Sequence, residues 1–148
     1  MTLRKTLYSL IILCCMFLNN CGYTPVYSSK ELSLSFNRIE HDQTKINNKI
    51  VRILKSLSKD ASQNKIDLKL NTKKEKIILS KNKKGDPDIF EIIITLDFEI
   101  DEVKQSLIAK QKYNNIENKF ELNNYEKTIE DQLIEKLISN LISYLSSF

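Results

Sequence analysis

Hydrophobic and polar residues alternate along several stretches of this chain, and this period of two predicts β-strands. Leu32, Leu34 and Phe36 alternate with polar residues and indicate a first, half-buried strand over 32–37. The clearest alternation spans residues 90–101 and predicts an antiparallel strand with one face in water. Its apolar members are Phe90, Ile92, Ile94, Leu96, Phe98 and Ile100.

Another long strand is expected between these two. Ile66, Leu68 and Leu70 alternate with polar residues, and the apolar group 77–79 follows after a lysine-rich interval, where we expect a bulge over 72–75. Residues 82–87 hold a glycine and a proline and predict a turn. A weaker strand is expected over 106–114, after the short polar link 101–105.

Two segments have the period of an amphipathic helix. The first spans 44–58, with Asp42 or Thr44 as its cap, and the second spans 125–148, with a helix of about 22 residues. Strands joined by short turns pair antiparallel, and two helices with one apolar side each must cover one face of the sheet. We therefore predict an α+β two-layer sandwich: a mainly antiparallel four-stranded sheet, two helices on one face, and the order β-α-β-β-β-α.

The first 20 residues contain no acidic residue and have the layout of a secretory signal peptide. A basic start precedes a 12-residue apolar run over 7–18. A transmembrane anchor is the alternative, but about 20 apolar residues are needed to cross a bilayer, and two asparagines end this run early. We expect a signal peptide over 1–20, a lipidated tether over 21–30 and a single domain over 31–148.

Cys21 directly follows the apolar run, and Leu18 lies three residues before it. This arrangement resembles the lipobox of bacterial lipoproteins, in which the cysteine is acylated and becomes the amino terminus. Several acyl chains hold a soluble domain on a bilayer, because each buried methylene contributes ~0.8 kcal/mol. A single mature cysteine would otherwise be an unpaired thiol in an oxidising compartment. Cys21 is thus the predicted lipidation site, and Gly22 after it resembles an outer-membrane sorting signal.

Composition argues against an enzyme and against a nucleic-acid ligand. Two glycines and no tryptophan leave no glycine-rich phosphate loop and no nucleophile elbow. One histidine and one mature cysteine are too few for a zinc or iron–sulfur site, so no metal or other cofactor is expected. Removing Arg4 and Lys5 with the signal peptide leaves 21 of the 23 basic residues against 19 acidic ones. This near balance gives no reason to expect nucleic acid.

The titratable residues that could suggest catalysis are an acidic row on one strand and the single histidine. Glu91, Asp97, Glu99 and Asp101 share one face of the predicted strand, but nothing predicts a pocket that would desolvate them, so we interpret them as solvent-facing. His41 lies in the predicted link between strand and helix, and we interpret it as a surface residue. No catalytic residue is predicted.

Six lysines surround the predicted long hairpin, and two interpretations of them stay open. They can blunt a sheet edge against aggregation, or their ammonium groups can contact the phosphates of an anionic ligand as a network. They are Lys73, Lys74, Lys76, Lys81, Lys83 and Lys84.

The start of the mature chain and the order of its elements resemble the lipopolysaccharide-assembly lipoprotein family LptE, also called RlpB. The residues that carry the resemblance are Cys21-Gly22-Tyr23-Thr24-Pro25-Val26-Tyr27, the strand end Tyr113-Asn114, and Tyr125-Glu126 before the last helix. The resemblance implies a lipid anchor on Cys21 and no catalytic residue.

The same resemblance implies an outer-membrane lipoprotein on the periplasmic face that assists assembly of the β-barrel LptD. It also implies that the protein binds lipopolysaccharide and delivers it to the outer leaflet. The six lysines, identified by their clustering, are then candidate contacts for the phosphates of lipopolysaccharide. The alternative is another cell-envelope lipoprotein that acts as a periplasmic protein-interaction module.

Overall fold

The structure is a computed structural model that describes residues 35–58 and 65–147. The signal peptide, Cys21, the tether, and Leu32 and Leu34 of the first predicted strand lie outside the described residues. The elements are β1 (Ser35–His41), α2 (Lys45–Leu57), β2 (Lys65–Lys81), β3 (Pro87–Ile100), β4 (Val103–Asn114) and α3 (Lys119–Leu145). Their order is the predicted one.

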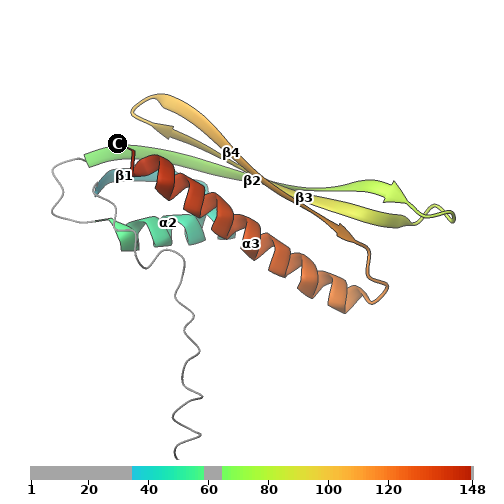
Figure 1. The fold of residues 1–148 in the computed structure, drawn as a ribbon. Helices are drawn as coiled ribbons and strands as arrows, with labels where there is room; N and C mark the ends of the chain where they lie inside the picture. The colour runs from blue at the N-terminus through green and yellow to red at the C-terminus, as the bar shows by residue number, and fades with distance from the viewer. Residues whose placement is uncertain (1–34, 59–64, 148) are drawn as a thin grey trace, which may run out of the picture.

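The four strands form one sheet in the order β1-β2-β3-β4. β2, β3 and β4 make an antiparallel meander, whereas β1 pairs parallel with β2. A parallel pair needs a crossover connection, and α2 supplies it. Both helices lie on the same side of the sheet, with α3 running along it (Figure 1). The prediction of a two-layer α+β sandwich with a mainly antiparallel sheet is confirmed.

The apolar row of β3 forms the centre of the core. Every second residue from Phe90 to Ile100 is buried, and these side chains belong to one cluster with those of both helices, such as Leu54 of α2 and Leu137 of α3. Full burial of one such side chain contributes about 1.5–3 kcal/mol. The row therefore determines which face of the sheet the helices cover.

Both helices begin at side-chain caps. The Thr44 hydroxyl accepts a hydrogen bond from the backbone N–H of Asn47, as the sequence predicts. Asn118 Oδ1 accepts from the N–H of Phe120 at 2.9 Å, so α3 begins at Lys119 and not at the predicted Tyr125. The prediction was wrong because Asn123 and Asn124 separate Phe120 and Leu122 of the first turn from the apolar row further along the helix.

Three details of the strands differ from the prediction. β1 extends to His41, which is therefore a strand residue of intermediate exposure and not part of the link. β2 pairs with β3 without interruption from Leu68 to Ile78, so the prediction of a bulge over 72–75 was wrong. The irregularities in this pairing lie between Ile78 and Lys81.

The turn between β3 and β4 is also shorter than expected. Asp101 and Glu102 form a two-residue turn with φ values of 46° and 73°. Positive φ at both central residues is what a tight hairpin turn requires, and glycine or asparagine usually supplies it. Because neither residue type is present here, the turn left no mark in the sequence, and β4 begins at Val103 instead of 106.

Candidate ligand-binding surface at the end of the long hairpin

The hairpin of β2 and β3 projects beyond the first strand and the first helix (Figure 1). β1 pairs only with residues 65–70 of β2. Within the described residues, the rest of β2 has β3 on one side and no strand on the other. The turn at 82–86 closes the hairpin, with Gly85 at a φ of 89°, where a side chain would be strained.

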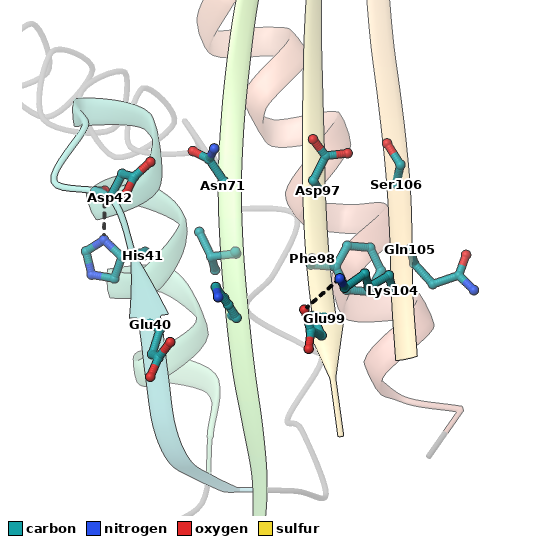
Figure 2. Close-up of a pocket in the computed structure, with 12 residues that line it drawn as sticks. Glu40, His41, Asp42, Asn71, Asp97, Phe98, Glu99, Lys104, Gln105 and Ser106 are labelled. Atoms are coloured by element: carbon teal, nitrogen blue, oxygen red, sulfur yellow. Dashed lines mark hydrogen bonds and ion pairs between the residues drawn. The ribbon is translucent and has the colours of Figure 1, made fainter. Parts of the chain in front are cut away.

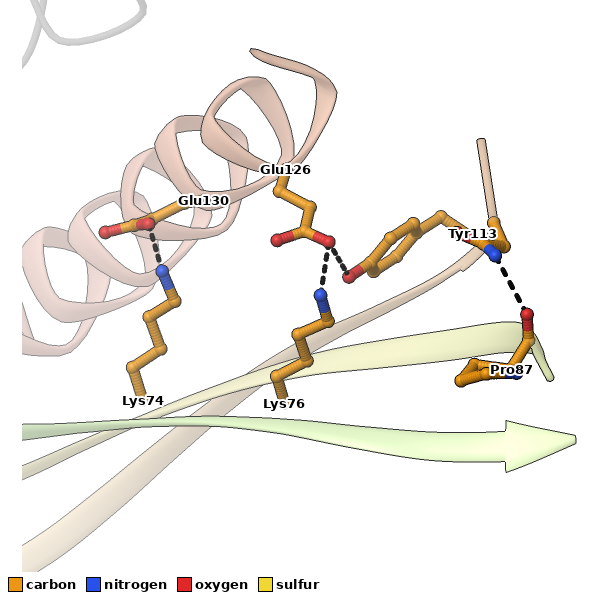
Figure 3. Close-up of polar contacts among 7 residues, drawn as sticks. Lys74, Lys76, Pro87, Tyr113, Glu126 and Glu130 are labelled. Carbon is orange, nitrogen blue, oxygen red and sulfur yellow. Dashed lines mark hydrogen bonds and ion pairs between the residues drawn. The ribbon is translucent and has the colours of Figure 1, made fainter. Parts of the chain in front are cut away.

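Two of the six candidate lysines face α3 and form ion pairs with its carboxylates. Lys74 and Lys76 lie on the helix-covered side of β2 and form ion pairs with two carboxylates of α3 (Figure 3). Lys74 pairs with Glu130, and the Nζ of Lys76 lies 2.5 Å from Oε1 of Glu126. Their ammonium groups therefore attach the helix to the sheet.

Glu126 connects both outer strands of the meander to α3. Its Oε1 also accepts a 2.7 Å hydrogen bond from the hydroxyl of Tyr113 on β4, and its side chain is only 18% exposed. Burial alone would raise the pKa of Glu126, but hydrogen bonds from Lys76 and Tyr113 and the nearby charges of Lys76 and Lys74 outweigh burial and lower it. Burial and the bond to Glu126 raise the pKa of Tyr113.

The other four lysines have different surroundings. Lys73 points to the opposite face of β2 and pairs with Glu75 at 2.6 Å, a contact that raises the pKa of Lys73. Lys81, Lys83 and Lys84 are exposed at the tip of the hairpin and form no ion pair with the described residues. The structure thus brings three of the six lysines together as free cations at one end of the molecule.

Exposed apolar side chains precede these cations on β2, and others lie on the first turns of α3. Residues 77–79 of β2, two isoleucines and a leucine, are 39%, 50% and 41% exposed. On α3, Phe120 is 73% exposed and Tyr125 is 42% exposed. A series of aromatic contacts leads from Ile78 to Tyr125. Ile78 lies opposite Phe90, Phe90 stacks on Tyr113 with ring centroids 5.5 Å apart, and Tyr113 meets Tyr125 edge-on with centroids 6.0 Å apart.

We call these residues the distal surface: residues 77–79, Lys81, Lys83 and Lys84 of the hairpin, with Phe120 and Tyr125 of α3. Exposed apolar groups close to unpaired cations fit an amphiphilic anion, which presents both hydrocarbon and phosphate. The lysines were predicted from the sequence as ligand contacts, whereas Phe120 and Tyr125 were not. The pair Asn118 and Glu121, spaced as a capping box, would have marked the true start of α3 and placed both aromatic residues on its first turns.

Asp97 and Glu99 of the acidic row on β3 lie away from the distal surface, whereas Glu91 lies opposite Ile77 of β2. Asp97 and Glu99 line a hollow of about 690 Å³ between the end of β1 and the first residues of β4, and Lys104 lies 4.0 Å from Glu99 (Figure 2). The solvent-facing interpretation holds for Asp97, which is exposed, but it is wrong for Glu91, which is 6% exposed. Asp101 belongs to the turn. Within the described part of the chain, no three His, Cys, Asp or Glu residues are grouped as metal ligands.

None of the helices in the part of the chain that the structure describes is both long and apolar enough to span a membrane.

The sequence matches no known family profile and no curated protein. Solved structures with a similar fold do exist. Rare lipoprotein B from Shewanella oneidensis has a TM-score of 0.60 at 11% identity, with 75% of this chain and 95% of that chain covered. An uncharacterized lipoprotein B from Nitrosomonas europaea has a TM-score of 0.59 at 14% identity, covering 80% and 88% of the two chains. A minor lipoprotein from Acinetobacter baumannii has a TM-score of 0.58 at 12% identity, covering 78% and 94%.

These similarities establish that the chain shares the fold of bacterial lipoproteins of the rare lipoprotein B type over most of its length. The resemblance noted in the sequence is therefore confirmed at the level of the fold. Because the identities are only 11–14%, the shared fold alone carries no residue roles from those proteins to this one.

Proposed function

We propose that the chain is an LptE-type lipoprotein of the outer membrane. In this proposal it is attached to the periplasmic face through acyl chains on Cys21, assists assembly of an LptD-type β-barrel, and binds lipopolysaccharide during its delivery to the outer leaflet. It is not an enzyme and uses no cofactor.

One observation carries the proposal: the whole β-α-β-β-β-α fold matches solved lipoproteins, in a chain whose sequence places a lipobox-like cysteine just ahead of that fold. Neither feature depends on the other. A fold of this kind serves many functions, and a cysteine after a short apolar run is a weak motif by itself. Their occurrence in one chain, in the right order, favours a lipid-anchored envelope protein.

The distal surface supports lipopolysaccharide as the ligand. Lipopolysaccharide carries phosphates next to acyl chains, and the distal surface places Lys81, Lys83 and Lys84 next to the exposed residues 77–79. A single exposed ammonium–phosphate contact contributes little, but several cations around one multiply charged headgroup act together. Lys73, Lys74 and Lys76 contribute less in this proposal, because carboxylates of the chain already hold them.

The anchor is tested by the Cys21→Ser variant. We expect it to remain unprocessed and to fractionate away from the outer membrane, because no acyl chains are attached. Cys15→Ser, within the predicted signal peptide, is the matched control and should be processed and located as the wild type is. Outer-membrane fractionation of Cys21→Ser at the wild-type level would refute lipidation as the anchor.

The partner is tested by affinity capture of the tagged chain from detergent-solubilised outer membranes. Recovery of a large β-barrel protein that functions in lipopolysaccharide transport is the expected result. Recovery of soluble periplasmic proteins alone would decide for the second candidate, a lipoprotein that acts as a periplasmic protein-interaction module. That candidate is favoured by the hollow beside β1, which lies apart from the distal surface and is open to a protein partner.

A further inference from the structure

Among the described residues, three stretches of strand lack a neighbouring strand on one side: β1, β4 and the part of β2 that β1 does not reach. β1 is short, with seven residues, and the two longer edges differ in charge. β4 forms one edge along Val103–Asn114, and its charged residues are all lysines: Lys104, Lys110 and Lys112. The other edge is the part of β2 that β1 does not reach, which begins after Leu70 and continues to Lys81. An open edge presents unpaired backbone N–H and C=O groups that can pair with another strand.

The end of the β2 edge has a self-complementary sequence. Residues 75–81 read Glu-Lys-Ile-Ile-Leu-Ser-Lys, with an acid at one end, a base at the other and three exposed apolar residues between them. When such a segment pairs antiparallel with a second copy of itself, each acid lies opposite a base. The apolar residues lie opposite one another at the centre.

We propose that two copies of this chain associate through residues 75–81 of β2, paired antiparallel about a two-fold axis at Ile78. In this register Glu75, which already pairs with Lys73 of its own chain, lies opposite Lys81 of the second copy, so one carboxylate serves both lysines. Ile77 lies opposite Leu79, and Ile78 opposite Ile78. The two four-stranded sheets then form one continuous sheet of eight strands. The inference goes beyond the proposed function and does not rest on it.

The ion pairs of the chain itself remove the charge that would oppose this contact. Lys74 and Lys76 belong to the same edge, but their ammonium groups are neutralised by Glu130 and Glu126 on α3. In the proposed register Lys76 lies opposite an uncharged residue, Ser80. The β4 edge is not self-complementary in charge. All of its charged residues are lysines, so pairing with a second copy places no acid opposite a lysine, and cross-strand pairs of like charge are destabilising.

The shape of the molecule also favours this edge. The hairpin projects beyond β1 and α2, so two antiparallel hairpins overlap only near their tips and the two bodies point in opposite directions (Figure 1). The irregular pairing with β3 leaves Leu79 without a partner residue on that strand, and its side chain is 41% exposed. A contact of seven residues per copy is smaller than a standard protein interface, so the association depends on protein concentration.

A disulfide measures the register directly. Residues opposite each other in an antiparallel pair have Cα atoms about 4.5–5.5 Å apart, a distance that a disulfide spans. The Ile78→Cys variant should therefore form a covalent dimer under mild oxidation, at least tenfold faster than Ile108→Cys, an exposed control on the β4 edge. Equal rates for the two variants, each with a wild-type unfolding midpoint, would overturn the proposal.

A charge exchange tests the ends of the pairing. The mass of the purified protein in detergent is measured by light scattering, and ultraviolet absorbance separates the mass of the protein from that of the detergent. The protein mass should rise toward twice that of the monomer as the protein concentration increases. Glu75→Lys and Lys81→Glu should each abolish the rise, and the double variant should restore it, because the pairs re-form with exchanged signs. Lys83→Gln with Lys84→Gln is the control, and it should keep the wild-type mass.

A monomer mass at every concentration, or a double variant that stays monomeric, would overturn the proposal. Either result is independent of whether the chain captures a β-barrel or binds lipopolysaccharide. The lysine control separates the two ideas further, because Lys83 and Lys84 belong to the proposed ligand contacts but not to the strand pairing.

Discussion

The carboxylate of Glu126 is the clearest place to test how α3 is held on the sheet. We consider Glu126→Gln, which keeps the size of the side chain and removes its charge. In the wild type this carboxylate accepts hydrogen bonds from the ammonium of Lys76 at 2.5 Å and from the hydroxyl of Tyr113 at 2.7 Å. The glutamine oxygen can still accept from Tyr113, but the ion pair with Lys76 is lost.

The magnitude follows from the exposure of the two partners. A hydrogen bond to a charged group contributes about 1.5–3 kcal/mol to stability, while an exposed ion pair contributes at most about 1 kcal/mol. Glu126 is 18% exposed and Lys76 is 37% exposed, so the pair lies between these limits. We expect the free energy of unfolding to fall by about 1–2 kcal/mol, and the melting temperature by about 3–8 °C for a domain of this size.

The pH dependence identifies charge as the cause. The pKa of Glu126 is lower in the folded protein than its ordinary value of 4.5, so ionisation of this group stabilises the fold at neutral pH. That contribution is present above pH 4.5 and is lost as pH falls below it, through the lowered pKa of the folded state. Urea unfolding of wild type and variant at pH 7 and at successively lower pH should show a difference that shrinks in acid.

The control is Tyr113→Phe, which removes one neutral donor and leaves the ion pair of Glu126 and Lys76 in place. The bond from Tyr113 also lowers the pKa of Glu126, so the effect of Tyr113→Phe should shrink in acid too. It should shrink by less than that of Glu126→Gln, which also removes the interactions with Lys76 and Lys74. If the loss caused by Glu126→Gln were the same at pH 3 as at pH 7, the carboxylate would act through packing, and the reasoning from charge would be refuted.

Three further predictions concern other parts of the molecule. Replacing Lys81, Lys83 and Lys84 by Gln should weaken binding of lipopolysaccharide and reduce the salt dependence of binding, without moving the unfolding midpoint. The same change at Lys104, Lys110 and Lys112 is the control and should leave both the affinity and its salt dependence unchanged. Equal losses of affinity in the two triple variants would mean that net charge, not position, attracts the ligand. Glu102→Gly should raise the free energy of unfolding by about 1 kcal/mol, because glycine adopts the φ of 73° without strain, and an unchanged melting temperature would contradict the strain. Asn47→Ala should lower the free energy of unfolding by about 1–3 kcal/mol, because the fully buried amide donates to the carbonyl of Asp42 and accepts from the Thr72 hydroxyl. Asn48→Ala, at the next and exposed residue, is the control. Similar losses of stability in the two variants would refute the role of burial.

The sequence predicts the elements well where one period dominates. The alternation through β3 gives its buried row, its strand type and the face that the helices cover, because a period of two determines which side chains share a face. The parallel pairing of β1 with β2 is not encoded in either strand alone. It follows from α2 returning the chain across the sheet, which is a property of the assembled fold.

The orientation of the lysines could have been predicted, and the assumed bulge prevented it. Counting by twos from Leu68 and Leu70 leads without interruption to Lys74 and Lys76, so both belong to the core-facing side of β2. A bulge over 72–75 would have reversed that assignment. What the sequence could not provide is the matching pair of carboxylates, because Glu126 and Glu130 lie 50 and 56 residues further along.

The position of α3 at the end of the described chain has a consequence for how the protein reaches its folded state. The meander of β2, β3 and β4 is built from neighbouring segments and precedes α3 along the chain, so it forms from local contacts. Until the 27 residues of α3 have also been delivered, much of the apolar row of β3 has no cover. A chain in which α3 has not yet packed on the sheet therefore exposes a hydrophobic strand face to other unfolded chains, and packing of α3 ends this aggregation-prone stage.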